Sequence, residues 1–282
     1  QEPSYGDASH GKKTDDAEAH YNLGVAYGES GKYKEAIKSL KQAIRIDPDY
    51  AKAHNNLGDA YSTLGKYKEA IESHKQAIRI DHDYADAHYN LGTVYHKLGK
   101  YKEAIESLKQ AIRIDPYNAD AHYNLGYAYD ELGKYKEAIE SYKQAIRIDP
   151  DDAEAHNNLG YAYDELGKYK EAIESYKQAI RIDHDYAYAH YNLGNAYGEL
   201  GKYKEAIKSY KQAIRIDPDD AVAHYNLACC YSLLGNVSKA LKSLGKAIDL
   251  GFDDIEHLES DSDLNGLRDE AGYKKLINKL KR

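Results

Sequence analysis

Apolar and small residues recur along this chain at intervals of three and four, the spacing of one face of an α-helix. In residues 119–152 a first such stretch ends just before Gly133 and a second runs on from there. The first stripe contains Leu125, Ala128, Tyr129 and Leu132, and the second contains Tyr135, Ala138, Ile139, Tyr142, Ala145 and Ile146. The pattern predicts two amphipathic helices joined by a short turn.

Helix-breaking and small residues mark the limits of both helices. Gly133 follows the first stripe, where a helix can end in a left-handed residue. Pro150 follows the second stripe, and the residue before a proline avoids the helical region. Gly126, Ala138 and Ala145 are small residues on the apolar stripes, so they allow the two helices to approach each other closely.

The same helical pair is written seven times, with a step of 34 residues. The repeats are 17–50, 51–84, 85–118, 119–152, 153–186, 187–220 and 221–254. One pair cannot bury its own apolar face, whereas stacked pairs can, so the stack itself forms the core. The sequence therefore predicts an all-α solenoid.

The two ends of the chain differ from the repeats. Residues 1–16 are polar and rich in Gly and Ser, which predicts a disordered leader. Residues 255–282 carry an amphipathic stripe made of Tyr273, Leu276, Ile277 and Leu280. We expect this segment to form a helix that caps the last repeat, because a solenoid must cover its terminal core face.

The repeat resembles the tetratricopeptide repeat, a 34-residue helical pair with Trp, Leu, Gly and Tyr, then Ala, Phe, Ala and Pro. The matching residues of the fourth repeat are His122, Leu125, Gly126, Tyr129, Ala138, Tyr142, Ala145 and Pro150. His replaces the family's Trp in all seven repeats, Leu, His or Tyr replaces Phe, and His82 and His184 replace Pro. The resemblance implies a right-handed superhelix whose concave groove is lined by the first helices.

The sixth residue of every repeat is asparagine: Asn22, Asn56, Asn90, Asn124, Asn158, Asn192 and Asn226. An amide can pair with both the N–H and the C=O of a peptide backbone. With first helices about 10 Å apart and an extended peptide advancing about 3.3 Å per residue, one Asn would meet about every third ligand residue. The segments "AHYNLG", "GKYKEAI" and "AIRIDP" are most similar to the superhelical repeat region of O-linked N-acetylglucosamine transferase, whose groove carries such a ladder. The alternative is that each Asn bonds a neighbouring helix and stabilises the stack.

The residues that vary between repeats fall at steps of three and four on the first helix, and so share one face. Charged positions on this face are mostly acidic, with Lys52 and Lys97 the exceptions, and several tyrosines accompany them. Tyrosine offers rigid area and a polar tip, so we expect an extended partner segment bearing Lys or Arg, with a plain solvated face as the alternative. The candidate peptide-binding residues are Asn56, Asn90, Asn124, Asn158, Asn192, Tyr123, Tyr127, Tyr161, Tyr191, Asp120, Asp130, Glu131, Glu154, Asp164 and Glu165.

Other kinds of site find little support in the sequence. The net charge of −8 disfavours a nucleic-acid partner, and no apolar run is long enough to insert into a membrane. The repeated histidines lie one repeat apart and cannot converge on one ion, so no metal and no cofactor are expected. Cys229 and Cys230 fit the role of small apolar residues, with a redox role as the alternative. No phosphate-binding loop or catalytic motif is present.

These features favour a non-enzymatic protein-protein interaction scaffold that binds an extended peptide in its groove. One alternative is a structural assembly protein that bridges subunits or stacks end to end as a homo-oligomer. Another is a targeting subunit of a separate enzyme. The first residue is Gln1 rather than Met, so we expect a removed export signal and an exported location, an artificial start being the alternative.

Overall fold

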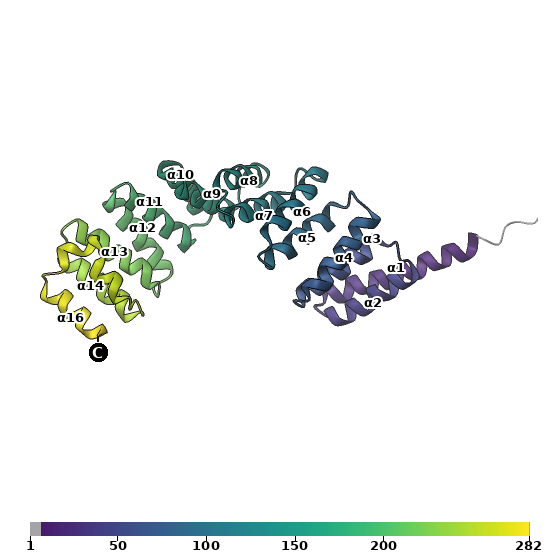
Figure 1. Ribbon diagram of the computed structural model, residues 1–282, viewed down its shortest axis with the longest axis horizontal. Coiled ribbons are helices and arrows are strands. Elements are labelled where there is room, and N and C mark those ends of the chain that lie inside the picture. Colours follow the sequence, from purple (N-terminus) through teal and green to yellow (C-terminus); the bar gives the residue numbers. More distant parts are fainter. Residues whose placement is uncertain (1–6, 282) are drawn as a thin grey trace, which may run out of the picture. The chain divides into compact units, whose positions relative to one another are not determined.

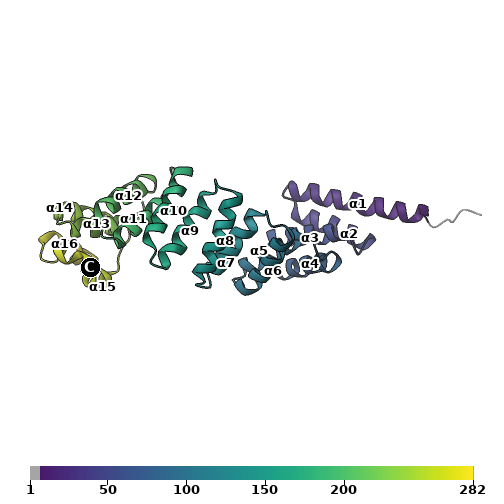
Figure 2. The same ribbon diagram turned by 90° about the horizontal axis from the view of Figure 1, so that it is seen from above.

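The computed structural model describes residues 7–281, and the side chains of residues 15–281. All elements in this range are helices (Figures 1 and 2), which confirms the predicted all-α repeat architecture. None of these helices is both long and apolar enough to cross a membrane. The chain divides into two compact units, Gln1–Ile148 and Asp149–Arg282, called here the N-terminal and C-terminal units.

The N-terminal unit contains α1 (Asp7–Glu29), α2 (Tyr33–Ile46), α3 (Ala51–Thr63), α4 (Tyr67–Ile80), α5 (Ala85–Lys97), α6 (Tyr101–Ile114), α7 (Ala119–Asp130) and α8 (Tyr135–Ile148). The C-terminal unit contains α9 (Ala153–Glu165), α10 (Tyr169–Ile182), α11 (Ala187–Glu199), α12 (Tyr203–Ile216), α13 (Ala221–Leu233), α14 (Val237–Asp249), α15 (Ile255–Ser260), the 3₁₀ helix η1 (Ser262–Leu267) and α16 (Ala271–Leu280). In each unit the helices pack as consecutive antiparallel pairs.

The turn within each repeat forms as the sequence predicts. Gly133 lies between α7 and α8 with φ of +68°, a conformation in which a side chain would be strained. The second helices end two residues before Pro150 and its equivalents. Where His82 and His184 replace the proline, α4 and α10 end at the same place, so the turn does not depend on proline.

The two helices of a repeat meet where a glycine of the first faces a large residue of the second. A Cβ atom on Gly126 would lie 2.8 Å from Cδ1 of Tyr142, whose side chain is fully buried. Tyr176 and Tyr210 pack in the same way against Gly160 and Gly194. The predicted close approach at the glycine is therefore confirmed, and it leaves room for a ring where the family has Phe.

The repeated histidine joins its helix to the turn that precedes it. Its Nε2 atom lies 2.9–3.2 Å from a backbone carbonyl six residues earlier. The pairs are His54–Pro48, His88–His82, His122–Pro116, His156–Pro150, His190–His184 and His224–Pro218. The ring thus donates to a carbonyl that proline or histidine can supply equally well, and this accounts for histidine in the family's Trp position.

The start of the chain differs from the expectation. Helix α1 begins at Asp7, so the predicted disordered leader is wrong for residues 7–16, and residues 1–6 lie outside the described part. No proline interrupts residues 7–16, and extending an existing helix is far easier than nucleating a new one. The first helix of the first repeat therefore continues upstream of Ala17.

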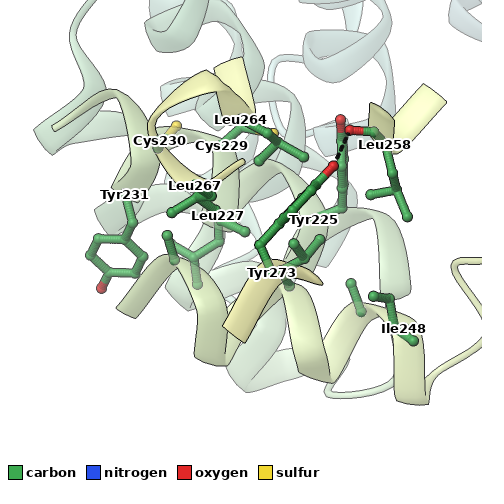
Figure 3. Packing of buried hydrophobic residues seen from close by; sticks show 14 of the residues in the cluster. Tyr225, Leu227, Cys229, Cys230, Tyr231, Ile248, Leu258, Leu264, Leu267 and Tyr273 are labelled. Carbon is green, nitrogen blue, oxygen red and sulfur yellow. Dashed lines mark hydrogen bonds between the residues drawn. The ribbon is translucent and has the colours of Figure 1, made fainter. Parts of the chain in front are cut away.

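The predicted C-terminal cap is confirmed. Tyr273 and Ile277 of α16 are buried, and Leu276 and Leu280 pack beside them on the core of α13 and α14. Figure 3 shows Tyr273 among Leu258, Leu264 and Leu267, which come from α15 and η1. The Tyr273 hydroxyl donates to the Leu258 carbonyl at 2.7 Å, and this bond ties α16 to α15.

Where the second helix packs against the glycine of the first, the second repeat carries His74, whereas the other repeats carry Leu or Tyr. His74 is fully buried against Gly58, and Nδ1 lies 3.0 Å from Asn55 Oδ1. Nε2 has no hydrogen-bond partner among the described residues and lies 3.7 Å from Asp59 Oδ1. Burial lowers the pKa of His74 to about 4, so the ring is neutral at pH 7.

We predict opposite effects for two alanine substitutions in α11. Gly194→Ala places Cβ 2.6 Å from Tyr210 Cε1, and the overpacking outweighs the gain in helix propensity, so the free energy of unfolding falls by about 1 kcal/mol. Gly198→Ala meets no atom within 4 Å and raises stability by about 0.5 kcal/mol. Urea denaturation followed by circular dichroism measures both. If both variants changed the free energy of unfolding equally and in the same direction, the contact between Gly194 and Tyr210 would not be tightly packed.

We predict that His74→Leu stabilises the protein, because leucine fills the equivalent site at Leu40 and Leu108. Removal of a buried nitrogen without a partner raises the free energy of unfolding by about 1 kcal/mol at pH 7. The folded-state pKa of about 4 lies below the ordinary value of 6.5, so the wild type loses stability as pH falls from 6.5 towards 4. The gap between the proteins therefore widens on acidification.

Urea titrations at pH 7, 5.5 and 4 test this. Burial raises the pKa of Asp59 to about 6 with the opposite pH trend, but Asp59 is present in both proteins, so its effect largely cancels from the difference. A gap that stays constant with pH would contradict a neutral, buried His74.

Candidate functional site

In the N-terminal unit, the repeated asparagines bond the preceding repeat. Asn56 Nδ2 donates to the Tyr21 hydroxyl at 3.3 Å, and Asn124 Nδ2 donates to the Tyr89 hydroxyl at 3.1 Å. Asn90 Nδ2 donates to Asn55 Oδ1 at 3.3 Å. In each case the partner is the fifth residue of the repeat before, so the amide joins consecutive first helices.

The C-terminal unit repeats this arrangement. Asn192 Nδ2 donates to Asn157 Oδ1 at 3.1 Å. Asn226 Nδ2 lies 3.2 Å from both the Tyr191 hydroxyl and Asn195 Oδ1. Asn158 Oδ1 accepts from Asn157 Nδ2 at 3.2 Å. The expectation that Asn stabilises the stack is thereby confirmed, and it is the reading that the sequence favoured less.

These bonds use the nitrogen of most of the amides and leave the oxygen of the same amides without a hydrogen bond in the described part of the chain. Among the described residues, Oδ1 accepts no hydrogen bond in Asn56, Asn90, Asn124, Asn192 and Asn226. Asn56, Asn90, Asn124 and Asn226 are half-buried, whereas Asn192 is buried. An amide held by its nitrogen presents its oxygen in a fixed direction, which lowers the entropy lost when that oxygen accepts a further bond.

The tyrosines predicted for peptide contact fall into different environments. Tyr123 and Tyr191 are half-buried, with ring centres 5.8 Å and 5.9 Å from those of Tyr142 and Tyr210. Tyr127 packs edge-on against His96 at 4.5 Å, while Tyr161 remains 40% exposed. The fifth-position tyrosines therefore belong partly to the stack, whereas Tyr161 stands on the surface.

The predicted acidic residues of the N-terminal unit do not form one cluster with the tyrosines. Glu131 is exposed near Tyr127 and Tyr101, and after burial it is the main cause that raises the pKa of both hydroxyls. Asp120 adds to the effect of burial in raising the pKa of Tyr89. Asp130 is half-buried at the end of α7.

In the C-terminal unit the structure gathers several predicted residues into one cleft of about 890 Å³. Asp164, Glu165 and Tyr191 line it, while the predicted Glu154, Asn158, Tyr161 and Asn192 do not. The other lining residues are Tyr169, Asn195, Gly198, Glu199, Tyr203, Tyr210, Tyr225, Asn226, Cys229, Cys230, Leu233, His257, Asp261 and Asp263. This set, called the acidic cleft below, holds five carboxylates and no Lys or Arg.

Crowding of carboxylates is visible in their pKa values. Burial, Glu199 and Glu165 together raise the pKa of Asp164 to about 6. Burial, Asp261 and Glu199 raise the pKa of Asp263. Asp164 Oδ1 is a buried atom with no hydrogen-bond partner among the described residues. The cleft therefore carries unneutralised negative charge that a cation would relieve.

Asp261 and the cysteines form an internal network at the rim of the cleft. The Asp261 carboxylate accepts from the Tyr225 hydroxyl and, at 3.7 Å, from the Cys229 thiol. Burial raises the pKa of Cys230 to about 12 and raises that of Cys229 as well, so both thiols stay protonated and poorly reactive. The Cys229 thiol and the carboxylates of Asp261 and Asp263 lie within 4.8 Å of one another. Hydrogen bonds from the Cys229 thiol and from the Asp263 backbone N–H to the Asp261 carboxylate hold the three residues together.

Sequence reasoning missed the side of the cleft formed by α15 and η1. His257, Asp261 and Asp263 lie outside the repeat, so no periodicity relates them to the first-helix face. The closely spaced acids of "DSD" at 261–263 were the only available signal. Glu199 and Asn226 did carry the repeat signal, and they reach the cleft from the end of α11 and the middle of α13.

Comparison with known proteins identifies the repeat. The family described as "TPR repeat" matches residues 26–65, 58–99, 92–133, 129–167, 162–201 and 194–235, and that described as "Tetratricopeptide repeat" matches 221–252. A search of curated proteins found no match. These findings support the repeat itself and give no support to a specific likeness to O-linked N-acetylglucosamine transferase.

Solved structures of repeat proteins are similar to this chain. A crystal structure of MamA is 32% identical, covers 58% of this chain and 96% of its own, and gives a TM-score of 0.56. MamA from Desulfovibrio magneticus RS-1 is 26% identical over 61% of this chain and 97% of its own, with a TM-score of 0.57.

A third structure is described as "YrrB: a TPR protein with an unusual peptide-binding site". It is 27% identical, covers 65% of this chain and 95% of its own, and gives a TM-score of 0.60. With the family matches spanning most of the sequence, this chain belongs to the tetratricopeptide repeat family.

Proposed function

We propose that this protein is a non-enzymatic interaction scaffold that binds an extended peptide segment along its first-helix faces. The observation that carries the proposal is the set of asparagine amides fixed through Nδ2, with Oδ1 left for a partner. Each oxygen can accept a backbone N–H of an extended segment, whatever the side chains of that segment are. Tyr127 and Tyr161 supply contact area beside this row.

Charge favours a segment that bears Lys or Arg. Asp120 and Glu154 stand on the same helices as Asn124 and Asn158, and Glu131 directly follows α7. The acidic cleft adds five carboxylates in the C-terminal unit. Complementary charge speeds association and disfavours acidic competitors. The description of YrrB as having a peptide-binding site agrees with this reading at the level of the family.

The assembly alternative lacks a supporting observation at the C-terminal end. Leu258, Leu264, Tyr273 and Ile277 cover the core of α13 and α14, so end-to-end stacking there would find no open apolar face. A targeting subunit would use the same peptide-binding faces, and it differs only in the partner that it carries.

We predict that Asn56→Ala combined with Asn124→Ala weakens binding of a peptide selected from a random 12-residue library on the full chain. Loss of two bonds of about 1 kcal/mol each lowers affinity by about 30-fold. Tyr21→Phe combined with Tyr89→Phe removes the same inter-repeat bonds but keeps the asparagine oxygens. This control should bind within about threefold of wild type.

Isothermal titration of all three proteins gives the affinities, after circular dichroism shows that each is folded. Equal losses in both variants would mean that Asn acts only through the stack. Failure of the library to yield any binding peptide would count against the proposed function itself.

We predict that affinity for a selected Lys- or Arg-bearing peptide rises between pH 5 and pH 7. The raised pKa of Asp164, about 6, means that this carboxylate gains its charge within that interval. By the same linkage, the unbound protein loses stability from Asp164 as pH rises from about 3.8 through about 6, because its protonated form is favoured in the fold. Asp164→Asn should flatten both trends, and titration calorimetry and urea denaturation at three pH values measure them.

A further inference from the structure

We propose that the acidic cleft is an anchoring pocket for one arginine side chain of the bound segment. The inference deepens the proposed function and rests on it for the origin of the arginine. It differs from the asparagine row because it concerns a single location in the C-terminal unit, which is built only where the repeats meet α15 and η1.

The geometry of the cleft favours a cation. Asp164 and Glu165 come from the end of α9, Glu199 from the end of α11, and Asp261 and Asp263 from the non-repeating segment. No Lys or Arg lines the cleft, and the basic side chain of its lining, His257, faces only Asp261, with Nε2 4.0 Å from Oδ2. Their mutual repulsion is a standing destabilisation that a bound cation removes.

The aromatic lining favours guanidinium over ammonium. Tyr169, Tyr191 and Tyr203 are half-buried in the walls, and Tyr210 and Tyr225 are almost fully buried behind them. A planar guanidinium can stack on a tyrosine ring while its fixed fork of donors reaches carboxylates on either side. A lysine ammonium is a compact, strongly hydrated charge, so it stacks less well on tyrosine rings and cannot reach several carboxylates with a fixed fork of donors.

A hydrogen-bond acceptor without a partner points in the same direction. Asp164 Oδ1 is buried and receives no bond among the described residues, although most buried polar atoms in proteins are paired. Other polar groups of the lining are already engaged: Asn195 Oδ1 accepts from the Tyr210 hydroxyl at 2.7 Å and from Asn226. Asp164 is thus the acceptor that a guanidinium N–H would complete.

The cleft also adjoins the asparagine row. Asn226 lines it and is held by Tyr191 and Asn195, with Oδ1 accepting no bond in the described part of the chain. An incoming backbone N–H can therefore bond Asn226 while the side chain of the same segment enters the cleft. This combination fixes the register of the segment, which a uniform row of asparagines cannot do.

The test uses the isotopically labelled full chain and the short peptide acetyl-Gly-Arg-Gly-amide. Residues 257–263 occur outside the repeats, so their amide resonances can be assigned despite the repetition. We expect the peptide to shift these resonances with a dissociation constant in the millimolar range. The same peptide with citrulline, which has the shape of arginine without its charge, should bind at least tenfold more weakly.

Variants locate the effect. Asp164→Asn combined with Glu199→Gln should weaken the arginine peptide at least fivefold. Glu29→Gln combined with Asp86→Asn makes the same change of charge on first helices of the N-terminal unit, and should leave the shifts at 257–263 unchanged. Equal binding of arginine and citrulline, or equal loss in both variants, would overturn the pocket. Stronger shifts with calcium chloride than with the peptide would also overturn it, in favour of a metal-ion site.

The outcome is separable from the proposed function, because a three-residue probe cannot span two repeats. No shift by the probe, together with intact binding of the selected 12-residue peptide, overturns only the arginine pocket. A normal response to the probe together with failure of every longer peptide leaves the pocket in place and overturns the extended-peptide mode.

Discussion

The contact between the two helices of a repeat sets the geometry of everything else in this protein. In the first six repeats a glycine on the first helix faces Leu, His or Tyr on the second, at a separation where even one methyl group would clash, and Ala228 takes its place in the seventh. The second-helix residue is therefore fully buried in most repeats, and it fixes how far the first helix stands from its partner. Tyr191 and Tyr123 then rest on the rings of Tyr210 and Tyr142, and so the face that carries the asparagines is positioned by the core beneath it.

The fold could be predicted almost completely from the sequence, because each of its local signals is written six or seven times. Helical period, the glycine turn and the stop at Pro150 or His184 are local signals, and repetition removes the ambiguity of any single copy. The leader was the exception, since a polar composition says little about whether an adjoining helix continues. The candidate site was less predictable. Asn124 and Tyr89 lie 35 positions apart in the sequence, and their hydrogen bond depends on the register between two successive first helices. No pattern within one repeat predicts that register.

The asparagines have a structural role, and one end of the same side chain could serve the binding role proposed above. An amide has two ends, and the stack uses the nitrogen end, while the oxygens of the half-buried Asn56 and Asn124 accept no bond in the described part of the chain. The structural bond orients the oxygen and so modestly lowers the freedom lost on binding, while the acceptor itself is present with or without that bond. The cost is that a substitution at these positions disturbs both roles. Only the partner residue, such as Tyr89, allows the structural bond to be removed alone.

A uniform repeat can bind a backbone but cannot define where on the chain a partner begins. Each Asn offers the same acceptor, so a segment could shift by one repeat with little change in energy. A bound segment can be held in one register only at a place where the repetition is broken. In the C-terminal unit that place is the junction of α11 and α13 with α15 and η1, where Asp261 and Asp263 join Asp164, Glu165 and Glu199 around tyrosine rings. The segment that covers the last core face with Leu258, Leu264 and Leu267 thus also supplies Asp261 and Asp263 to the acidic cleft, so capping and the proposed selection of a partner depend on the same short segment.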